Sequence, residues 1–235
     1  MWQTGAVGKR QEARNRIEAQ IVQVGRRHLV TDGAAGLSLR AIARDLGMVS
    51  SAVYRYVASR DDLLTLLLVD AYDDLADAVD AAARAGDWNH RLVALARAAR
   101  AWAVDQPARW ALLYGSPVPG YHAPPELTVG PGTRVIATLL TIVADGVRSG
   151  AVGSPDDSMG EPISSDFDGI RAEFAFPGGD RLMLACLSTW ATVVGAISLE
   201  VFGQYGADTL SDPGAVFDAQ LGLLVHMMSS EFPAN

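Results

Sequence analysis

The residues best suited to a chemical task lie between positions 38 and 60, where hydroxyl and guanidinium groups recur at short intervals. Serine and tyrosine hydroxyls can bond to DNA bases or phosphates, and arginine guanidinium groups bind phosphate. The side chains that we predict to contact DNA are Ser38, Arg40, Ser50, Ser51, Tyr54, Arg55, Tyr56 and Arg60. Spacing alone also fits a helical hairpin whose polar residues form an ordinary solvated surface.

The charge of the chain supports a polyanionic partner for this segment. Residues 1–60 hold ten Lys or Arg and four Asp or Glu, a net charge of +6, whereas residues 61–235 hold nine and twenty-three, a net −14. The whole chain is therefore acidic, at −8, although its first quarter is basic. Such a division favours DNA as a partner of the first segment and not of the rest.

Patterns typical of catalysis or metal binding are not found in the sequence. The four histidines are far apart and have no metal-ligand spacing. The GSPVPG segment at 115–120 lacks the spacing of a nucleophile elbow, and PGG at 177–179 lacks the Lys-Ser/Thr of a phosphate loop. We therefore expect no enzyme activity, no metal and no cofactor. The single cysteine provides no disulfide framework and residues 1–16 lack a signal-peptide core, which favours the cytoplasm.

The DNA-contacting side chains require a particular arrangement of helices. Apolar periodicity predicts a first helix from about residue 9 to the glycines at 33 and 36, and a second helix capped by Ser38. Gly47 allows a sharp turn, and Ser50 and Ser51 are expected to cap a third helix that ends near Val57. Two helices joined by such a turn are typical of a helix-turn-helix, whose second helix enters the DNA major groove.

The rest of the chain is also predicted to be helical. Alanine and leucine dominate, and β-branched residues do not alternate as in strands. Residues 116–132 are expected to form a Pro/Gly loop, and residues 150–180 a mobile loop. Further helices are expected at about 59–84, 87–105, 106–115, 133–149, 179–205 and 214–230. The apolar stretch 182–199 is long enough to span a membrane, but its hydroxyl residues favour the centre of a helical bundle.

The segment LSLRAIARDLGMVSSAVYRYVASRDDLL, residues 37–64, resembles the N-terminal domain of TetR/AcrR-type transcriptional regulators. The family's Ile-Ala pair, glycine turn, aromatic end of the recognition helix and polar start of the fourth helix occur here as Ile42-Ala43, Gly47, Tyr54-Arg55-Tyr56-Val57 and Ser59-Arg60-Asp61. Val49 stands where the family usually has a capping Ser or Thr, so Ser50 is expected to cap instead and shift the helix start. Tyr56 replaces the usual His and Arg60 the usual Lys, and both can still bind phosphate.

The C-terminal half resembles a ligand-binding class of that family through QPARWALLYGSPVPGYHAP and WATVVGAISLE, with Trp190, Gly195 and Glu200 at familiar spacing. The resemblance implies a helical domain that binds a small molecule and dimerises through its last two long helices. The expected ligand-binding residues are Trp102, Trp110, Tyr114, Tyr121, His122 and Trp190, although aromatics at such spacing are more often plain core.

Small residues on the penultimate helix and an apolar stripe on the last one suit a four-helix dimer interface. The expected interface residues are Gly195, Leu199, Leu221, Leu224, Val225 and Met228. The alternative is that both helices close the core of a monomer.

The sequence thus predicts an all-α chain of about nine helices in two domains: a three-helix helix-turn-helix domain over 1–60 and an effector-binding and dimerisation domain over 61–235. The expected function is that of a cytoplasmic homodimeric repressor, released from a palindromic double-stranded DNA operator by a small apolar effector. A helical enzyme and a scaffold, each with an incidental helix-turn-helix, are the alternatives.

Overall fold

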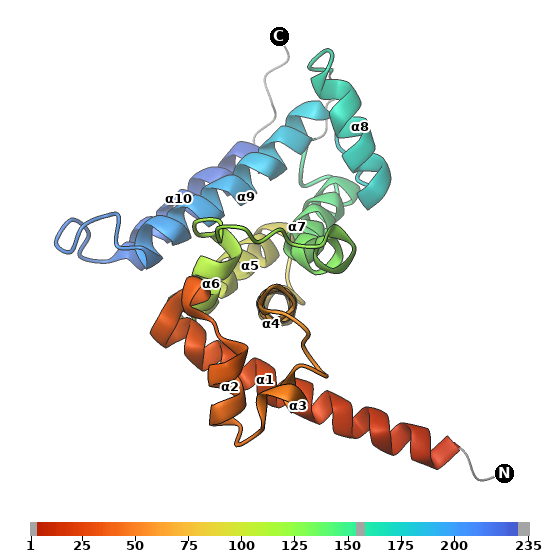
Figure 1. Ribbon diagram of the computed structural model, residues 1–235. Coiled ribbons are helices and arrows are strands. Elements are labelled where there is room, and N and C mark those ends of the chain that lie inside the picture. The colour runs from red at the N-terminus through yellow and green to blue at the C-terminus, as the bar shows by residue number, and fades with distance from the viewer. Residues whose placement is uncertain (1–3, 154–157, 230–235) are drawn as a thin grey trace. The chain divides into compact units, whose positions relative to one another are not determined.

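The computed structural model describes residues 4–153 and 158–229. Ten helices and no strands occur in these ranges (Figure 1). The helices are α1 (Thr4–Gly36), α2 (Leu39–Asp45), α3 (Ser50–Val53), α4 (Arg60–Ala82), α5 (Trp88–Asp105), α6 (Pro107–Tyr114), α7 (Pro125–Arg148), α8 (Ile163–Phe174), α9 (Asp180–Val201) and α10 (Pro213–Ser229).

The chain divides into two compact units, whose bounds differ from those of the two domains expected from the sequence. Unit 1 comprises Met1–Asp73 and Ala108–Gly132, and unit 2 comprises Asp74–Pro107 and Thr133–Asn235. Helix α6 and the loop after it therefore belong with α1–α3 and not with the C-terminal body. Helices α4 and α7 each contribute residues to both units.

The core of unit 1 is formed by one apolar face from each of α1, α2, α3 and α4. Ile21 of α1, Ile42 of α2, Val53 of α3 and Leu64 of α4 are fully buried in it. Val118 and several neighbours from α6 and the following loop pack against this cluster. The local caps follow the sequence: the Ala41 amide donates to the Ser38 side chain, and the Asp62 amide to that of Ser59.

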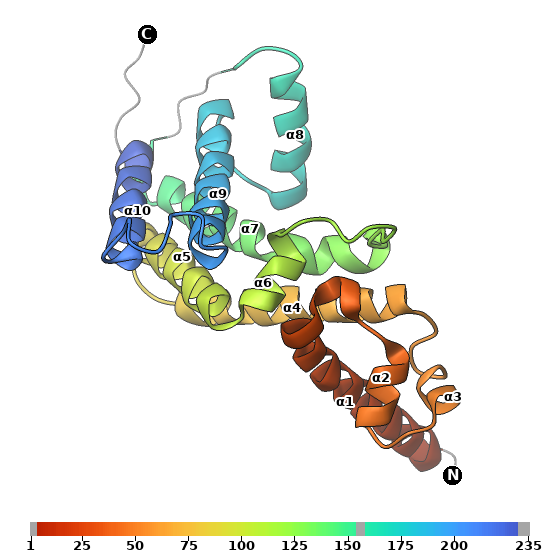
Figure 2. The ribbon, with the colours of Figure 1, turned by 60° about the vertical axis from the view of Figure 1, so that its left-hand side comes forward.

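In unit 2, helix α9 packs against α5, α8 and α10. Figures 1 and 2 both show α8 beside α9. Salt bridges join α5 to its neighbours: Arg97 to Asp218 of α10 and Arg100 to Glu200 of α9, with shortest distances of 2.8 and 2.5 Å. Length and composition would allow α7 and α9 to span a membrane, which is weak evidence of a span. The packing of α9 against three other helices agrees with its expected position at the centre of a helical bundle.

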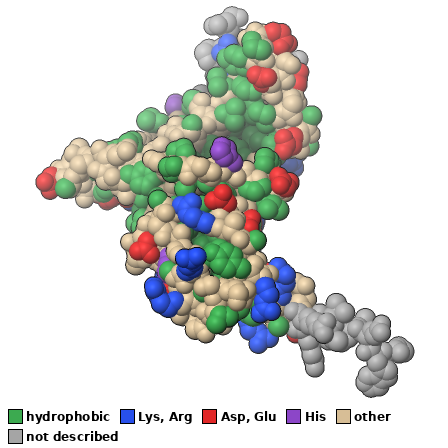
Figure 3. All heavy atoms as spheres, in the orientation of Figure 1, with side chains coloured by type: hydrophobic (Ala, Val, Ile, Leu, Met, Phe, Trp, Pro, Cys, Tyr) green, Lys and Arg blue, Asp and Glu red, His purple; other side chains and the backbone are tan. Residues whose placement is uncertain are grey.

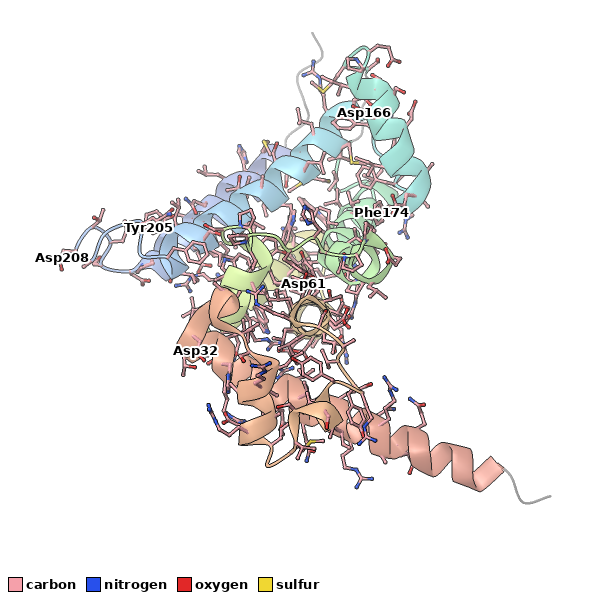
Figure 4. All side chains as sticks on the ribbon, in the orientation of Figure 1. Asp32, Asp61, Asp166, Phe174, Tyr205 and Asp208 are labelled. Atoms are coloured by element: carbon pink, nitrogen blue, oxygen red, sulfur yellow. The ribbon has the colours of Figure 1, made fainter. Side chains whose placement is uncertain are left out.

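Two expected loops contain helix. The predicted mobile loop over 150–180 holds α8, and Figure 4 marks Asp166 and Phe174 on this helix. Helix α7 begins at Pro125, eight residues before the expected 133. Proline is well tolerated at the first position of a helix because that position needs no amide donor, which accounts for Pro125. Pro131 lies inside the helix, so composition alone did not predict α7 here.

Candidate DNA interface

Helices α2 and α3 and the turn between them form the expected helix-turn-helix. Gly47 adopts a left-handed conformation with φ of 66°, which glycine alone adopts at little cost. The amide of Met48 donates to the carbonyl of Ala43 at 2.9 Å and closes the turn. Val53 is fully buried, so its side chain holds α3 to the core.

The start of α3 differs from the expectation. Val49 is the N-cap residue, its backbone is extended, and no side chain caps the helix. Ser50 and Ser51 lie within the first turn and do not cap it, so the expected shift of the start is wrong. Burial of Met48 and Val53 on either side determines the register, which leaves Val49 at the cap position.

Helix α3 also ends earlier than the expected position near Val57. The α-helix stops at Val53, and a turn that includes a 3.1 Å bond from the Val57 amide to the Val53 carbonyl continues the chain. Val57 is buried, whereas Tyr54 and Arg55 are exposed and Tyr56 is half-buried. Tyr54 and Arg55 therefore face outward from the core of unit 1, whereas the ring of Tyr56 packs against it.

A shallow cleft of about 240 Å³ brings several of the predicted DNA-binding residues together. The start of α2, the residue after α3 and the start of α4 contribute to it. Its lining residues are Leu37, Ser38, Leu39, Arg40, Tyr54 and Arg60. Guanidinium and hydroxyl groups at one surface depression suit a DNA phosphate. Figure 3 shows Lys and Arg side chains gathered over the α1–α3 part of the chain.

Arg60 has a structural partner that the sequence did not reveal. Its Nη2 donates to the carbonyls of Ala34 and Ala35 at 2.9 and 3.2 Å, at the end of α1. The guanidinium group thus satisfies carbonyls that have no partner within a helix end. Because these residues are about 25 positions away, only the fold could show this contact.

A second cleft, of about 430 Å³, extends the basic and aromatic surface toward α1. Arg14 of α1 lies 5.9 Å from the ring centroid of Tyr56, within reach of a cation–π contact. Arg14 also pairs with Glu18 at 2.7 Å. Arg55 and Tyr54 line the same cleft. Arg14 is therefore a candidate phosphate contact that the sequence analysis did not identify. In the sequence it is one of several arginines in the first helix, and nothing there distinguishes it from the others.

His28 connects α1 to the end of α2. Its Nε2 donates to Asp45 Oδ2 at 2.8 Å, and its Nδ1 lies 3.6 Å from the carboxylate of Asp32. The hydrogen bond from His28 lowers the pKa of Asp45 below its usual value. The buried His28 thus links α1 to α2 through a hydrogen bond beside the turn that positions α3.

The expected ligand-binding residues are divided between the units. In unit 1, Trp110 is fully buried and its ring centroid lies 4.3 Å from that of Tyr114. Tyr121 is hydrogen-bonded through its hydroxyl to Thr65 at 2.9 Å, and His122 is exposed. Burial raises the pKa of Tyr114, so this phenol stays neutral. In unit 2, Trp102 donates its indole N–H to Asp74 at 3.1 Å, and Trp190 is half-buried.

Part of the expected dimer stripe is unavailable for a partner. Leu221 and Met228 are buried within unit 2, and Leu224 and Val225 are half-buried. Gly195 and Leu199 of α9 are exposed. The large apolar side chains exposed on α9 and α10 are Leu184, Leu199, Leu223 and Met227. Both faces of α10 are apolar, so periodicity alone could not separate the inward face from the outward one.

Within the described ranges, no three or more His, Cys, Asp or Glu side chains lie close enough to hold a metal ion. Cys186 is buried, and burial raises the pKa of its thiol to about 12, so it is not a reactive thiolate.

Comparisons with known proteins agree with this geometry. Residues 92–224 match the family described as "Tetracyclin repressor-like, C-terminal domain". The HTH-type transcriptional regulator Rv1816 of Mycobacterium tuberculosis is 63% identical over 232 residues, which cover 97% of this chain and 99% of the relative.

Two solved structures extend the comparison. The crystal structure of SCO4313, which is described as a regulatory protein, is 33% identical with a TM-score of 0.74 and covers 91% of this chain and 97% of its own. FadR from Bacillus subtilis, solved in complex with stearoyl-CoA, has the same fold with a TM-score of 0.62 at 15% identity. That match covers 88% of this chain and 97% of FadR.

Proposed function

Because the chain belongs to the TetR/AcrR family of DNA-binding transcriptional regulators, we propose that it is a homodimeric repressor that a small apolar effector releases from a palindromic operator. Its relatives are named as transcriptional regulators and not as enzymes, and it would act in the cytoplasm where the DNA is. The observation that carries the proposal is the sharing of α4 and α7 between the two units.

The shared helices offer a mechanical route from effector to DNA. Helix α4 starts at Arg60, directly after the recognition segment, and its last residues belong to unit 2. A change in the body that moves α4 or α7 must therefore also move the segments of these helices in unit 1. In a dimer, that movement alters the distance between two recognition helices, which DNA requires at about 34–36 Å or a multiple.

The loop between α6 and α7 is fixed to α4 inside unit 1. Tyr121 and Thr65 share a hydrogen bond of 2.9 Å, and Val118 packs against the unit 1 core. Arg109 of α6 donates to the backbone carbonyl of Asp70 at 3.0 Å and pairs with its carboxylate at 3.1 Å. These bonds support coupled movement of α6, the loop and the first half of α4.

The outward face of α9 and α10 supports dimerisation. Leu223 is 72% exposed and Leu184 is 42% exposed, and an added Cβ at Gly195 or Gly222 would meet nothing within 4 Å. Exposed leucines beside glycines allow helices of a second copy to approach closely. A palindromic operator follows from the two-fold symmetry of such a dimer.

The charge distribution favours a neutral or cationic effector over an anionic one. Residues 61–235 carry a net charge of −14. Three arginines that could attract an anion are engaged: Arg97 with Asp218, Arg100 with Glu200 and Arg109 with Asp70. Aromatic rings attract cations, and they also suit neutral apolar molecules. The stearoyl-CoA held by FadR supports small-molecule binding by this fold but does not identify the effector here.

The test is a titration of hydrophobic cations, neutral aromatics and carboxylic acids against tryptophan emission and operator binding. A true effector should change the emission and weaken operator binding, and saturating operator should weaken effector binding by the same factor. Release of DNA by small carboxylic acids alone would contradict the proposed effector class. Turnover of a compound without DNA would favour the enzyme alternative, and a stable dimer without selective DNA binding would favour the scaffold.

A further inference from the structure

Val49 combines three properties that folding alone does not explain. Its side chain is 71% exposed, although its neighbours along the helix-turn-helix, Met48 and Val53, both face the core. It occupies the cap position of α3 without making a cap hydrogen bond. It also lies directly before Ser50 and Ser51, which are two of the residues predicted to contact DNA.

A valine is an unfavourable choice for this position in the free protein. Ser, Thr, Asp and Asn stabilise a helix start because their side chains accept a hydrogen bond from an exposed backbone amide, which valine cannot do. A large exposed apolar side chain also gains nothing from water. The side chain of Val49 therefore makes no cap hydrogen bond and is largely exposed, and its place at the start of α3 points to a role in the bound state.

The nearest binding partner on this surface is DNA. In a helix-turn-helix the beginning of the second helix faces the base edges in the major groove. Thymine carries the one apolar group at these edges, its 5-methyl group, and small aliphatic side chains recognise it by direct contact. We propose that Val49 reads a thymine by packing against its 5-methyl group.

This inference rests on DNA recognition by α3 and assigns a specificity role to a residue outside the predicted contact set. The polar neighbours cannot replace it, because the hydroxyls of Ser50 and Ser51 recognise hydrogen-bonding groups that several bases share. Val49 adds a preference that depends on one methyl group. Arg40 and Tyr54, which line the nearby cleft, supply affinity for phosphate that does not depend on the base.

The experiment uses the full chain and an operator obtained by selecting bound fragments from random DNA. Each thymine of the selected site is replaced in turn by deoxyuridine, which lacks only the 5-methyl group. Dissociation constants are measured at fixed salt for the unchanged protein, for V49S and for V30S. Val30 of α1 is 72% exposed and provides the matched control.

Each half-site should contain one thymine whose single replacement by deoxyuridine weakens binding of the unchanged protein about fourfold. This is the factor expected for one methyl group removed from water. V49S should bind the thymine and deoxyuridine sites equally, and V30S should keep the fourfold difference. Thermal unfolding should show V49S to be at least as stable as the unchanged protein, because serine can cap α3.

Two results would overturn the inference. Either no thymine position responds to loss of its methyl group, or V49S responds as strongly as the unchanged protein. Selection that enriches no sequence would be a different result, since it would contradict recognition of DNA by α3 and the proposed function with it.

Discussion

Arg60 is the residue at which a role in DNA binding and a role in the fold meet. Its guanidinium group borders the cleft beside Tyr54 and also binds the last carbonyls of α1. The Arg60 side chain would therefore be preorganised for a phosphate contact in the free protein, because its hydrogen bonds to the α1 carbonyls already restrict its conformation. Arg40, which is exposed at the same cleft, offers a comparison in which only DNA binding should change.

Replacing either arginine by alanine should separate these roles. R40A should lower the slope of log affinity against log salt by about 0.9 per chain, since one phosphate contact is lost, and leave the unfolding temperature unchanged. R60A should reduce the slope similarly and also lower the unfolding temperature, because two α1 carbonyls lose their donor. Salt titrations of DNA affinity and thermal melts measure both effects. R84A, at an exposed position after α4, is the control, and an unchanged slope for R40A would exclude Arg40 from the interface.

Asp180 is the residue that holds α8 to the start of α9. It is 2% exposed and accepts hydrogen bonds from Ser164, from the backbone amide of Met159 and from Arg171. These bonds, with Ser164 contributing most, lower the pKa of Asp180 to about 2. A carboxylate whose pKa is lower in the folded state stabilises the fold fully above its unfolded pKa of about 4, and loses that effect as the pH falls toward 2.

The pH dependence of D180N tests this attachment. The unchanged protein should be more stable than D180N by a constant amount above about pH 4, and the difference should shrink as the pH approaches 2. Unfolding temperatures across this range give the comparison. D168N is the matched control, because Asp168 also pairs with Arg171 but is exposed, so its effect should be smaller. A difference that stays constant down to pH 2 would contradict the role of the Asp180 carboxylate.

Helix α7 approaches the start of α5 too closely for any side chain at Gly146. An added Cβ would lie 2.6 Å from Val152 Cγ2 and 2.9 Å from Trp88 Cγ. G146A should therefore lower the free energy of unfolding by about 1–3 kcal/mol. G169A, in the open middle of α8, should raise it by up to about 1 kcal/mol, because alanine is the better helix former. Denaturant unfolding measures both, and equal effects of the two changes would contradict the packing described for Gly146.

Much of the element structure was predictable because it depends on neighbours in sequence. Ser38 marks a cap and Gly47 a turn through local hydrogen bonds and backbone freedom, and the structure places both as expected. Helix α8 was missed because its support is remote: Phe167 is buried, and Arg171 bonds to Asp180 nine residues away. The contact of Arg60 with the end of α1 and the burial of Leu221 likewise depend on tertiary packing, which sequence patterns do not predict.

At the scale of the whole molecule, we predict that Leu223 lies in the interface of the proposed dimer. This side chain is 72% exposed in one chain, so L223E should leave the fold of the chain intact. In a dimer the same change would place a charge in an apolar contact, which is strongly unfavourable. Sedimentation velocity should show a dimer for the unchanged protein and a monomer for L223E. V104E, at a half-exposed position on α5, should remain dimeric. A dimer that survives L223E unchanged would place the interface elsewhere.

The most direct test of the whole account is the sequence and stoichiometry of the DNA that the chain selects. Random fragments bound by the full chain are sequenced, and the number of chains on the selected duplex is measured by sedimentation. We predict an inverted repeat whose half-site centres lie one helical turn, about 34–36 Å, or a multiple of this distance apart. At least two chains should occupy each selected duplex. Enrichment of no sequence, or of a single half-site bound by one chain, would contradict a dimeric regulator that reads DNA through α3.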